Sequence, residues 1–202
     1  TAIKMGLRPY LTITLTALNL NDLPALTQFA IQNQLFLNWN FYRPNSINDP
    51  LLPDYDELIG TMQRALDVAR KNMAEYSFFD KLVDRSNFSI PHKHTCGAGI
   101  NYLSVDYDGS ILPCHMLSGA NHLGIPLASI SRTGFENFDN PSVDTKTECN
   151  CCEWRYWCAG GCPVLSKALQ SPISQPPYCK VYKAIYPEII KIKGLQLLTF
   201  TK

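Results

Sequence analysis

The sequence predicts an α/β protein in which a parallel strand-and-helix unit precedes a small, cysteine-rich α+β domain. Strand-like and helix-like patterns alternate over residues 1–75, and this order favours a parallel sheet with crossover helices. All eight cysteines lie in the remainder of the chain, from Cys96 onward. We therefore expect residues 1–75 to form the α/β unit, residues 76–95 to form a bridge, and residues 96–202 to form the cysteine-rich domain.

The composition indicates a folded protein without a polyelectrolyte surface. Of the 202 residues, 46% are hydrophobic and 17% are charged, which argues against disorder. The formal net charge of +1 gives no reason to expect binding to nucleic acid or to an anionic membrane surface. We see no signal peptide in residues 1–20 and no apolar stretch long enough to span a membrane. We expect a cytoplasmic protein, in which clustered cysteines are metal ligands more often than disulfides.

The elements of the first part follow from local patterns. An alternating, β-branched stretch predicts the first strand, and a second apolar stretch ending at a proline predicts the next strand. Helical spacing of apolar residues predicts a helix after each strand, the first capped by the side chains of Asn19, Asn21 and Asp22. The expected elements are a strand at 9–16, a helix at 23–34, a strand at 35–44 and a helix at 53–73.

The cysteines follow a regular spacing. Cys149 begins a C-x2-C-x5-C-x3-C pattern that ends at Cys162, with Cys151 as an additional thiol in the first gap. Upstream, Cys96 begins C-x12-G-x4-C, and downstream Cys179 stands alone. Thiolates are soft ligands that favour zinc, copper(I) and iron–sulfur clusters. The seven cysteines of this pattern are more than the four ligands of one tetrahedral site and one fewer than the eight ligands of two such sites.

This spacing resembles that of the SPASM domain, which lies at the C-terminus of radical S-adenosylmethionine enzymes that modify peptides. All seven cysteines and Gly109 are in register with it. The stretches WRYWCAGGCP and YCKVYKAIYPEIIK are also similar to members that mature ribosomally made peptides. The resemblance implies that residues 1–75 are a remnant of the (β/α) partial barrel of these enzymes.

One part of the family pattern is missing. The C-x3-C-x2-C motif that holds the catalytic cluster is absent, because no cysteine precedes Cys96. The chain is then expected to be a C-terminal fragment of a longer protein or a shortened homologue. By either interpretation, this polypeptide alone lacks the radical-generating step. S-adenosylmethionine and a third [4Fe-4S] cluster would belong to the full-length protein.

The resemblance also implies two [4Fe-4S] clusters with interleaved ligands. The ligands of the first cluster would be Cys149, Cys152, Cys158 and Cys179. Those of the second would be Cys96, Cys114 and Cys162, with Cys114 returned toward Cys96 by a hairpin turn at Asp108-Gly109. The fourth position of the second cluster is left open, filled by water, filled by His92 or His94, or supplied after a rearrangement by Cys151.

Other residues are weaker candidates. Trp154, Tyr156 and Trp157 are expected to shield a cluster from water, with substrate contact as the alternative. Asn38 and Asn40 share one face of the second strand and are candidates for binding S-adenosylmethionine near the end of that strand, or else for filling a barrel interior. His115 and His122 are interpreted as structural.

The leading functional hypothesis is the C-terminal part of a radical S-adenosylmethionine peptide maturase. Its expected partners are a precursor peptide and an electron donor such as a flavodoxin or ferredoxin, with no nucleic acid and no membrane. One alternative is a non-catalytic iron–sulfur module for electron transfer or peptide binding. Another is a structural zinc domain, since cysteine-rich hairpins also form zinc ribbons.

Overall fold

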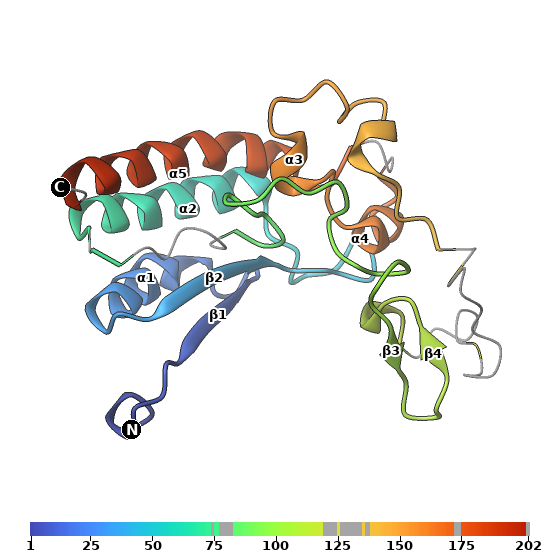
Figure 1. The fold of residues 1–202 in the computed structure, drawn as a ribbon, viewed down its shortest axis with the longest axis horizontal. Helices are drawn as coiled ribbons and strands as arrows, with labels where there is room; N and C mark the ends of the chain where they lie inside the picture. The colour runs from blue at the N-terminus through green and yellow to red at the C-terminus, as the bar shows by residue number, and fades with distance from the viewer. Residues whose placement is uncertain are drawn as a thin grey trace.

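The computed structural model describes residues 1–73, 75–76, 83–118, 125, 135, 138–171 and 175–200. It is a mixed α/β fold with a small parallel sheet, several helices and a separate antiparallel hairpin (Figure 1). The predicted α/β class is therefore confirmed. In chain order the elements are η1 (Ile3–Met5), β1 (Tyr10–Leu15), η2 (Leu20–Asp22), α1 (Leu23–Gln32), β2 (Phe36–Phe41), α2 (Tyr55–Lys71), β3 (Ser104–Val105), β4 (Ile111–Leu112), η3 (His115–Leu117), η5 (Val143–Thr145), α3 (Arg155–Cys158), α4 (Pro163–Ala168) and α5 (Cys179–Phe200).

The strands β1 and β2 are parallel, as predicted, and their register runs from Tyr10 opposite Phe36 to Leu15 opposite Phe41. Alternation divides β2 into two faces, because successive side chains of a strand point in opposite directions. Leu37, Trp39 and Phe41 are buried in the main core. Asn38 and Asn40 belong to the other face. Within the described residues, the sheet extends beyond β2 by one parallel bridge, between Trp39 and Val83.

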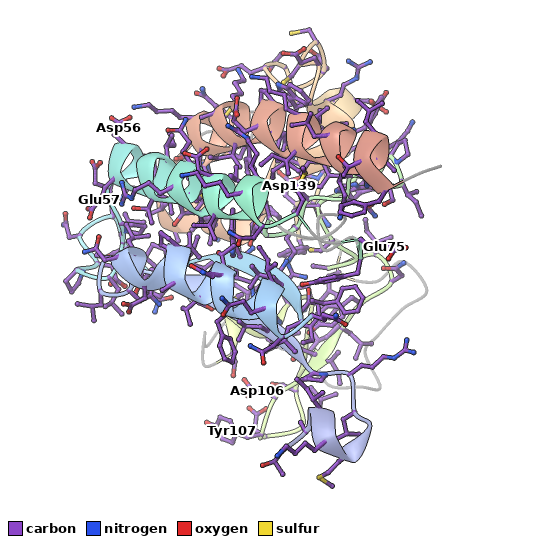
Figure 2. The ribbon with its side chains drawn as sticks, turned by 90° about the vertical axis from the view of Figure 1, so that its left-hand side faces the viewer. Asp56, Glu57, Glu75, Asp106, Tyr107 and Asp139 are labelled. Carbon is purple, nitrogen blue, oxygen red and sulfur yellow. The ribbon has the colours of Figure 1, made fainter. Side chains whose placement is uncertain are left out.

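Three helices form a row along the apolar face of this sheet. Helix α1 packs against α2, and α2 packs against α5 (Figure 1). The start of α2 is capped by Asp54, whose side chain accepts hydrogen bonds from the backbone N–H groups of Asp56 and Glu57. Figure 2 shows the acidic Asp56 and Glu57 beside this end of the helix, where the helix dipole favours negative charge.

The predicted capping of α1 by asparagine and aspartate side chains is wrong. Asp22 precedes α1 but makes no side-chain cap hydrogen bond. The amide of Asn19 instead accepts from the N–H of Thr16 and donates to the carbonyl of Thr14. The short helix η2 leads directly into α1, so backbone turns take the place of the expected cap.

Helix α5 joins the two ends of the chain in one core. Its buried residues Val181, Ile185 and Ile189 belong to the same apolar cluster as Trp39 and Leu66. The structure thus packs the last described helix against elements from the first third of the sequence. None of the helices in the described ranges combines the length and apolar character needed to cross a bilayer.

The predicted hairpin is present as β3 and β4, with Val105 opposite Ile111. Gly109 has a φ of +82°, in the left-handed region that glycine adopts without a steric penalty. The N–H of Gly109 donates to the carbonyl of Asp106, which tightens the turn. Tyr107 lies at the tip and is 94% exposed (Figure 2). The hairpin therefore places Cys114, two residues after β4, back against the rest of the domain.

Candidate metal centre

Four cysteines from three separate segments line one small pocket. Cys149 and Cys152 lie in a turn in which the N–H of Cys152 donates to the carbonyl of Cys149 at 2.9 Å. Cys158 ends the short helix α3, and Cys179 begins helix α5. All four line the pocket, together with Trp154, Arg155, Lys183 and others. The structure thus brings together the four residues that the sequence analysis assigns to the first site.

The three remaining candidate ligands form a second group. Cys96 and Cys162 are close enough to Cys114 to raise the pKa of its thiol, although burial of Cys114 is the larger cause. Cys114 follows β4, and Cys162 immediately precedes helix α4. The segment directly after residue 95, the segment after the hairpin and the turn before α4 therefore each contribute one cysteine to this group.

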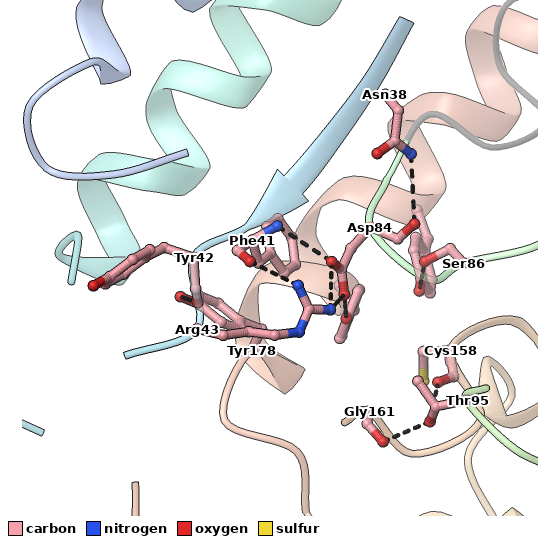
Figure 3. A network of polar contacts seen from close by, with 12 residues as sticks. Asn38, Phe41, Tyr42, Arg43, Asp84, Ser86, Thr95, Cys158, Gly161 and Tyr178 are labelled. Atoms are coloured by element: carbon pink, nitrogen blue, oxygen red, sulfur yellow. Dashed lines mark hydrogen bonds and ion pairs between the residues drawn. The ribbon is translucent and has the colours of Figure 1, made fainter. Parts of the chain in front are cut away.

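The loop from Cys158 to Cys162 connects the two groups. The side-chain hydroxyl of Thr95 donates to the carbonyl of Gly161, as Figure 3 shows, and also contacts the carbonyl of Ala159 at 3.1 Å. Because Thr95 directly precedes Cys96, these bonds tie the first cysteine of the second group to the loop that leaves the first group. Sequence analysis did not select Thr95, because a lone threonine has no distinguishing spacing.

Burial raises the pKa of three thiols of the first group, which favours their protonated form. Burial, as the largest cause, and the neighbouring Cys149, Cys152 and Cys179 together raise the pKa of Cys158 to about 11. Burial also raises the pKa of Cys149 and of Cys179. Thiolate is the form that binds metal, so metal binding at this group must release protons.

The spacing of the candidate ligands differs from what a single metal ion requires. Among the described residues, no group of three or more histidine, cysteine or acidic side chains is placed to hold a metal ion. A tetrahedral zinc site requires each sulfur at about 2.3 Å from a common centre. An iron–sulfur cluster lies between its thiolates and separates them more widely. Soft sulfur donors around one pocket fit the chemistry of an iron–sulfur cluster and of zinc alike.

Cys151 is placed outside the first group. It is exposed, and the pocket is lined by its neighbours Cys149 and Cys152 instead. The turn therefore directs the thiols at positions 149 and 152 inward and the intervening thiol toward solvent.

The two histidines before Cys96 differ in their contacts. His94 is engaged, with Nδ1 at 3.0 Å from the carbonyl of Asn140. Both ring nitrogens of His92 are buried and lack a hydrogen-bond partner among the described residues, and burial lowers the pKa of His92. Asn140, which sequence analysis missed, also donates to the carbonyls of Cys96 and Ala98. Of the two histidine candidates, His94 is the one linked to Cys96, through Asn140.

His115 lies outside both groups. Its Nδ1 is 3.2 Å from the hydroxyl of Tyr102 beside the hairpin, in an exposed contact. The other histidine interpreted as structural, His122, lies outside the described residues.

The aromatic side chains around α3 are half-buried and pack together. Trp154 lines the first pocket, and its ring lies 5.1 Å from that of Trp157 and 5.7 Å from that of Tyr186. Tyr156 points to a different partner, since its hydroxyl donates to Asp144. Trp154 is thus the aromatic residue of this stretch that borders the four thiols.

Asn38 and Asn40 line a larger, polar pocket of about 500 Å³ beside the second group. Its floor is the polar face of β1 and β2, including Tyr10 and Thr12, and its wall includes Cys96. The volume lies within the range of small-molecule sites, about 300–1,000 Å³. The structure thus brings the two asparagines and one candidate metal ligand to the same pocket.

A buried ion pair supports the wall of this pocket. Arg43 contacts both carboxylate oxygens of Asp84, at 2.8 and 3.0 Å, and Oδ1 of Asp84 also accepts from the N–H of Phe41 (Figure 3). Burial disfavours the charge on Arg43, but the Asp84 carboxylate raises its pKa overall. Sequence analysis missed this pair because its members are 41 residues apart.

The fold and the site together define an α/β protein with two groups of cysteines, one of which lines a common pocket. No model of a known protein family matches the chain. An uncharacterized protein from Archaeoglobus fulgidus is 30% identical over 96 residues, which are 45% of this chain and 23% of the relative. The match thus spans about a quarter of that relative's length, and its printed description names no activity.

Proposed function

We propose that this chain is the C-terminal part of a radical S-adenosylmethionine enzyme with a SPASM domain, acting on a ribosomally made peptide. In this proposal it binds two [4Fe-4S] clusters. The observation that carries it is the pocket lined by Cys149, Cys152, Cys158 and Cys179, which come from three separate segments. Convergence of these four residues, with Cys151 left outside, is what a four-thiolate cluster site requires.

When bound, the clusters supply one-electron transfer, and the chain supplies ligands and a dry environment. The thiols of the first group give up their protons and become thiolates on binding iron. Trp154 covers one side of the pocket, and the surrounding apolar shell tunes the potential by excluding water. An electron donor such as a flavodoxin or ferredoxin would supply electrons to this module.

The second site, at Cys96, Cys114 and Cys162, has three cysteine ligands in this proposal. Its fourth position is open to water, to a substrate group, to His92 or to His94. The contact of His94 Nδ1 with the carbonyl of Asn140 favours His94, because it is the usual arrangement of a histidine that binds metal through Nε2, and Asn140 also donates to the carbonyl of Cys96. Imidazole replaces thiolate as a ligand in some iron–sulfur centres, so this assignment is chemically sound.

The parallel unit is proposed to be the last part of a partial barrel, in a cytoplasmic protein. Support comes from the polar pocket on the β1 and β2 face, where Asn38 and Asn40 lie in the same pocket as Cys96. S-adenosylmethionine or part of the precursor peptide would occupy this space in the complete enzyme. The third cluster and the radical step belong to residues that this sequence does not contain.

A second candidate is an iron–sulfur module without its own radical chemistry. Like the first candidate, it rests on the pocket lined by four cysteines. Both candidates require the same clusters. They differ in whether the encoding gene contains an upstream C-x3-C-x2-C motif and a neighbouring short peptide gene.

The test is the content of iron and acid-labile sulfide in protein purified without oxygen, with an electron paramagnetic resonance spectrum after reduction. We expect about eight irons and eight sulfides per chain, since each of two [4Fe-4S] clusters holds four. About four irons would limit the proposal to the first site. Zinc without sulfide would overturn it in favour of a structural zinc domain.

A further inference from the structure

Lys146 is a buried lysine at the junction of the two cysteine groups. It is 4% exposed, and its ammonium donates to the carbonyls of Ala159 at 3.2 Å and Gly160 at 3.1 Å. Among the described residues it forms no ion pair with a carboxylate. A buried charge is costly unless it is compensated, so an anionic partner is expected nearby.

The loop that Lys146 holds has an unusual conformation. Ala159, Gly160 and Gly161 have consecutive positive φ angles of 48°, 73° and 68°. A Cβ on Gly160 would lie 2.7 Å from both Cδ and Nζ of Lys146. The lysine side chain therefore lies directly against the glycine, and this close approach requires the absence of a side chain at position 160.

This conformation also orients a backbone donor. While the Gly160 carbonyl accepts from Lys146, the backbone N–H of Gly160 lies near Cys158 and lowers the pKa of that thiol. A hydrogen bond to a thiolate stabilises its negative charge. By binding the carbonyls of this loop, Lys146 also fixes the position of the Gly160 N–H group beside Cys158, a proposed ligand.

Lys146 lies between the two groups, because the two carbonyls that it binds stand between Cys158 of the first group and Cys162 of the second. Cys149, Cys158, Asp139 and Cys162, when negatively charged, favour its protonated form. Burial lowers the pKa of Lys146, and these neighbours counteract it when they are negatively charged. The compensating anions for the buried ammonium are therefore found mainly among the candidate metal ligands.

We propose that Lys146 is a positioning residue that holds the Cys158–Cys162 loop and places one positive charge between the two cluster sites, raising the reduction potential of both. This inference rests on the proposed function. One-electron reduction of a cluster adds one negative charge to its site. A fixed cation in a poorly solvated position stabilises that added charge, because Coulomb interactions are strong where water is excluded.

The experiment compares midpoint potentials of the wild type and of Lys146→Met, a substitution that keeps an unbranched side chain and removes the charge. Both proteins are purified without oxygen and titrated with dithionite as the reductant, with the clusters followed by electron paramagnetic resonance. Lys183→Met is the matched control, since Lys183 lines the first pocket but is exposed. Lys146→Arg is the variant that retains the charge.

We expect Lys146→Met to lower the ratio of reduced to oxidised cluster at least tenfold, relative to the wild type at the same applied potential. For a one-electron couple this is a fall of about 59 mV in midpoint potential. Lys183→Met should shift it less, because water screens an exposed charge. Intact clusters with wild-type potentials in Lys146→Met would overturn the inference and leave the proposed function standing.

Two further outcomes are also decisive. If Lys146→Met loses iron while Lys146→Arg retains both clusters, the charge is needed to hold the loop, which supports the positioning role. If both variants lose iron equally, the lysine acts through its shape alone and the inference is wrong. A wild type without iron and sulfide would overturn the proposed function, and the inference with it.

Discussion

Tyr182 donates a hydrogen bond of 3.0 Å to Oδ2 of Asp84, although 98 residues separate the two in the sequence. Tyr182 lies one turn after Cys179 on α5, and Asp84 follows the residue that bridges to β2. The same carboxylate binds Arg43. This contact therefore fixes the end of α5 that carries Cys179 relative to the parallel sheet.

Removing the carboxylate at this point should be strongly destabilising. The side chain of Asp84 is 3% exposed and that of Arg43 is 13% exposed. Asp84→Ala leaves the guanidinium buried without its partner, which costs roughly 3–5 kcal/mol. Urea unfolding of the wild type and the variant measures this loss.

The control for this prediction is an exposed ion pair. Lys180 pairs with Asp56 at the surface, with both side chains more than half exposed. Lys180→Ala should lower the free energy of unfolding by less than about 1 kcal/mol. A similar small loss in Asp84→Ala would contradict a structural role for the buried pair.

Two glycine substitutions should have opposite effects on stability. Gly161 has a φ of +68°, and a Cβ there would lie 2.2 Å from Cβ of Pro176. Gly161→Ala should therefore destabilise the fold by about 1–3 kcal/mol through strain and steric overlap. Gly194 lies inside α5 with no atom within 4 Å of a built Cβ, so Gly194→Ala should stabilise it by about 0.4–1 kcal/mol.

Thermal or urea unfolding of the two alanine variants tests this pair. Both substitutions add the same methyl group. A difference in the sign of the change in unfolding free energy therefore reflects the backbone conformation and the surroundings of each glycine. If Gly161→Ala were as stable as the wild type, the close approach of the Cys158–Cys162 loop to Pro176 would be wrong.

Single cysteine variants should separate ligands from the additional thiol. Cys158 is buried at the first pocket, whereas Cys151 is exposed outside it. We expect Cys158→Ala to lose about four irons per chain, the content of one [4Fe-4S] cluster. Cys151→Ala should keep the iron and sulfide content of the wild type.

Iron and sulfide analysis of both variants, purified without oxygen, provides the measurement. Equal iron loss in both would mean that the thiols at 151 and 158 are both ligands or that neither acts specifically. Iron loss from Cys151→Ala alone would support the rearranged ligand set in which Cys151 takes part.

His92 should make stability depend on pH in the acidic range. Burial lowers the pKa of His92 in the folded protein below the ordinary value of 6.5, which the unfolded chain keeps. At a pH between the folded and the unfolded pKa, the unfolded chain therefore binds more protons than the folded protein. The contribution of His92 to stability is complete above about pH 6.5 and is lost as the pH falls through the folded pKa.

The free energy of unfolding at pH 7.5 and at pH 5 measures this effect. His92→Gln removes the titrating ring, so it should lose less stability between these two values than the wild type. Equal losses in the two proteins would show that the His92 ring is not desolvated as the structure describes.

Local elements were predictable because their causes lie within a few residues. The helical spacing of apolar residues predicted α2, and the Asp108-Gly109 turn predicted the hairpin. The one local error was at α1, where Asn19 bonds to the backbone of the preceding turn instead of capping the helix.

The sequence by itself determined the α/β class, the main helices and the spacing of seven cysteines. Only the tertiary structure decided which groups lie together across long separations. It brought Asp84 to Arg43, and Lys146 to the carbonyls before Cys162. These contacts depend on how buried faces pack and how buried charges are compensated, and no local pattern of residues encodes that.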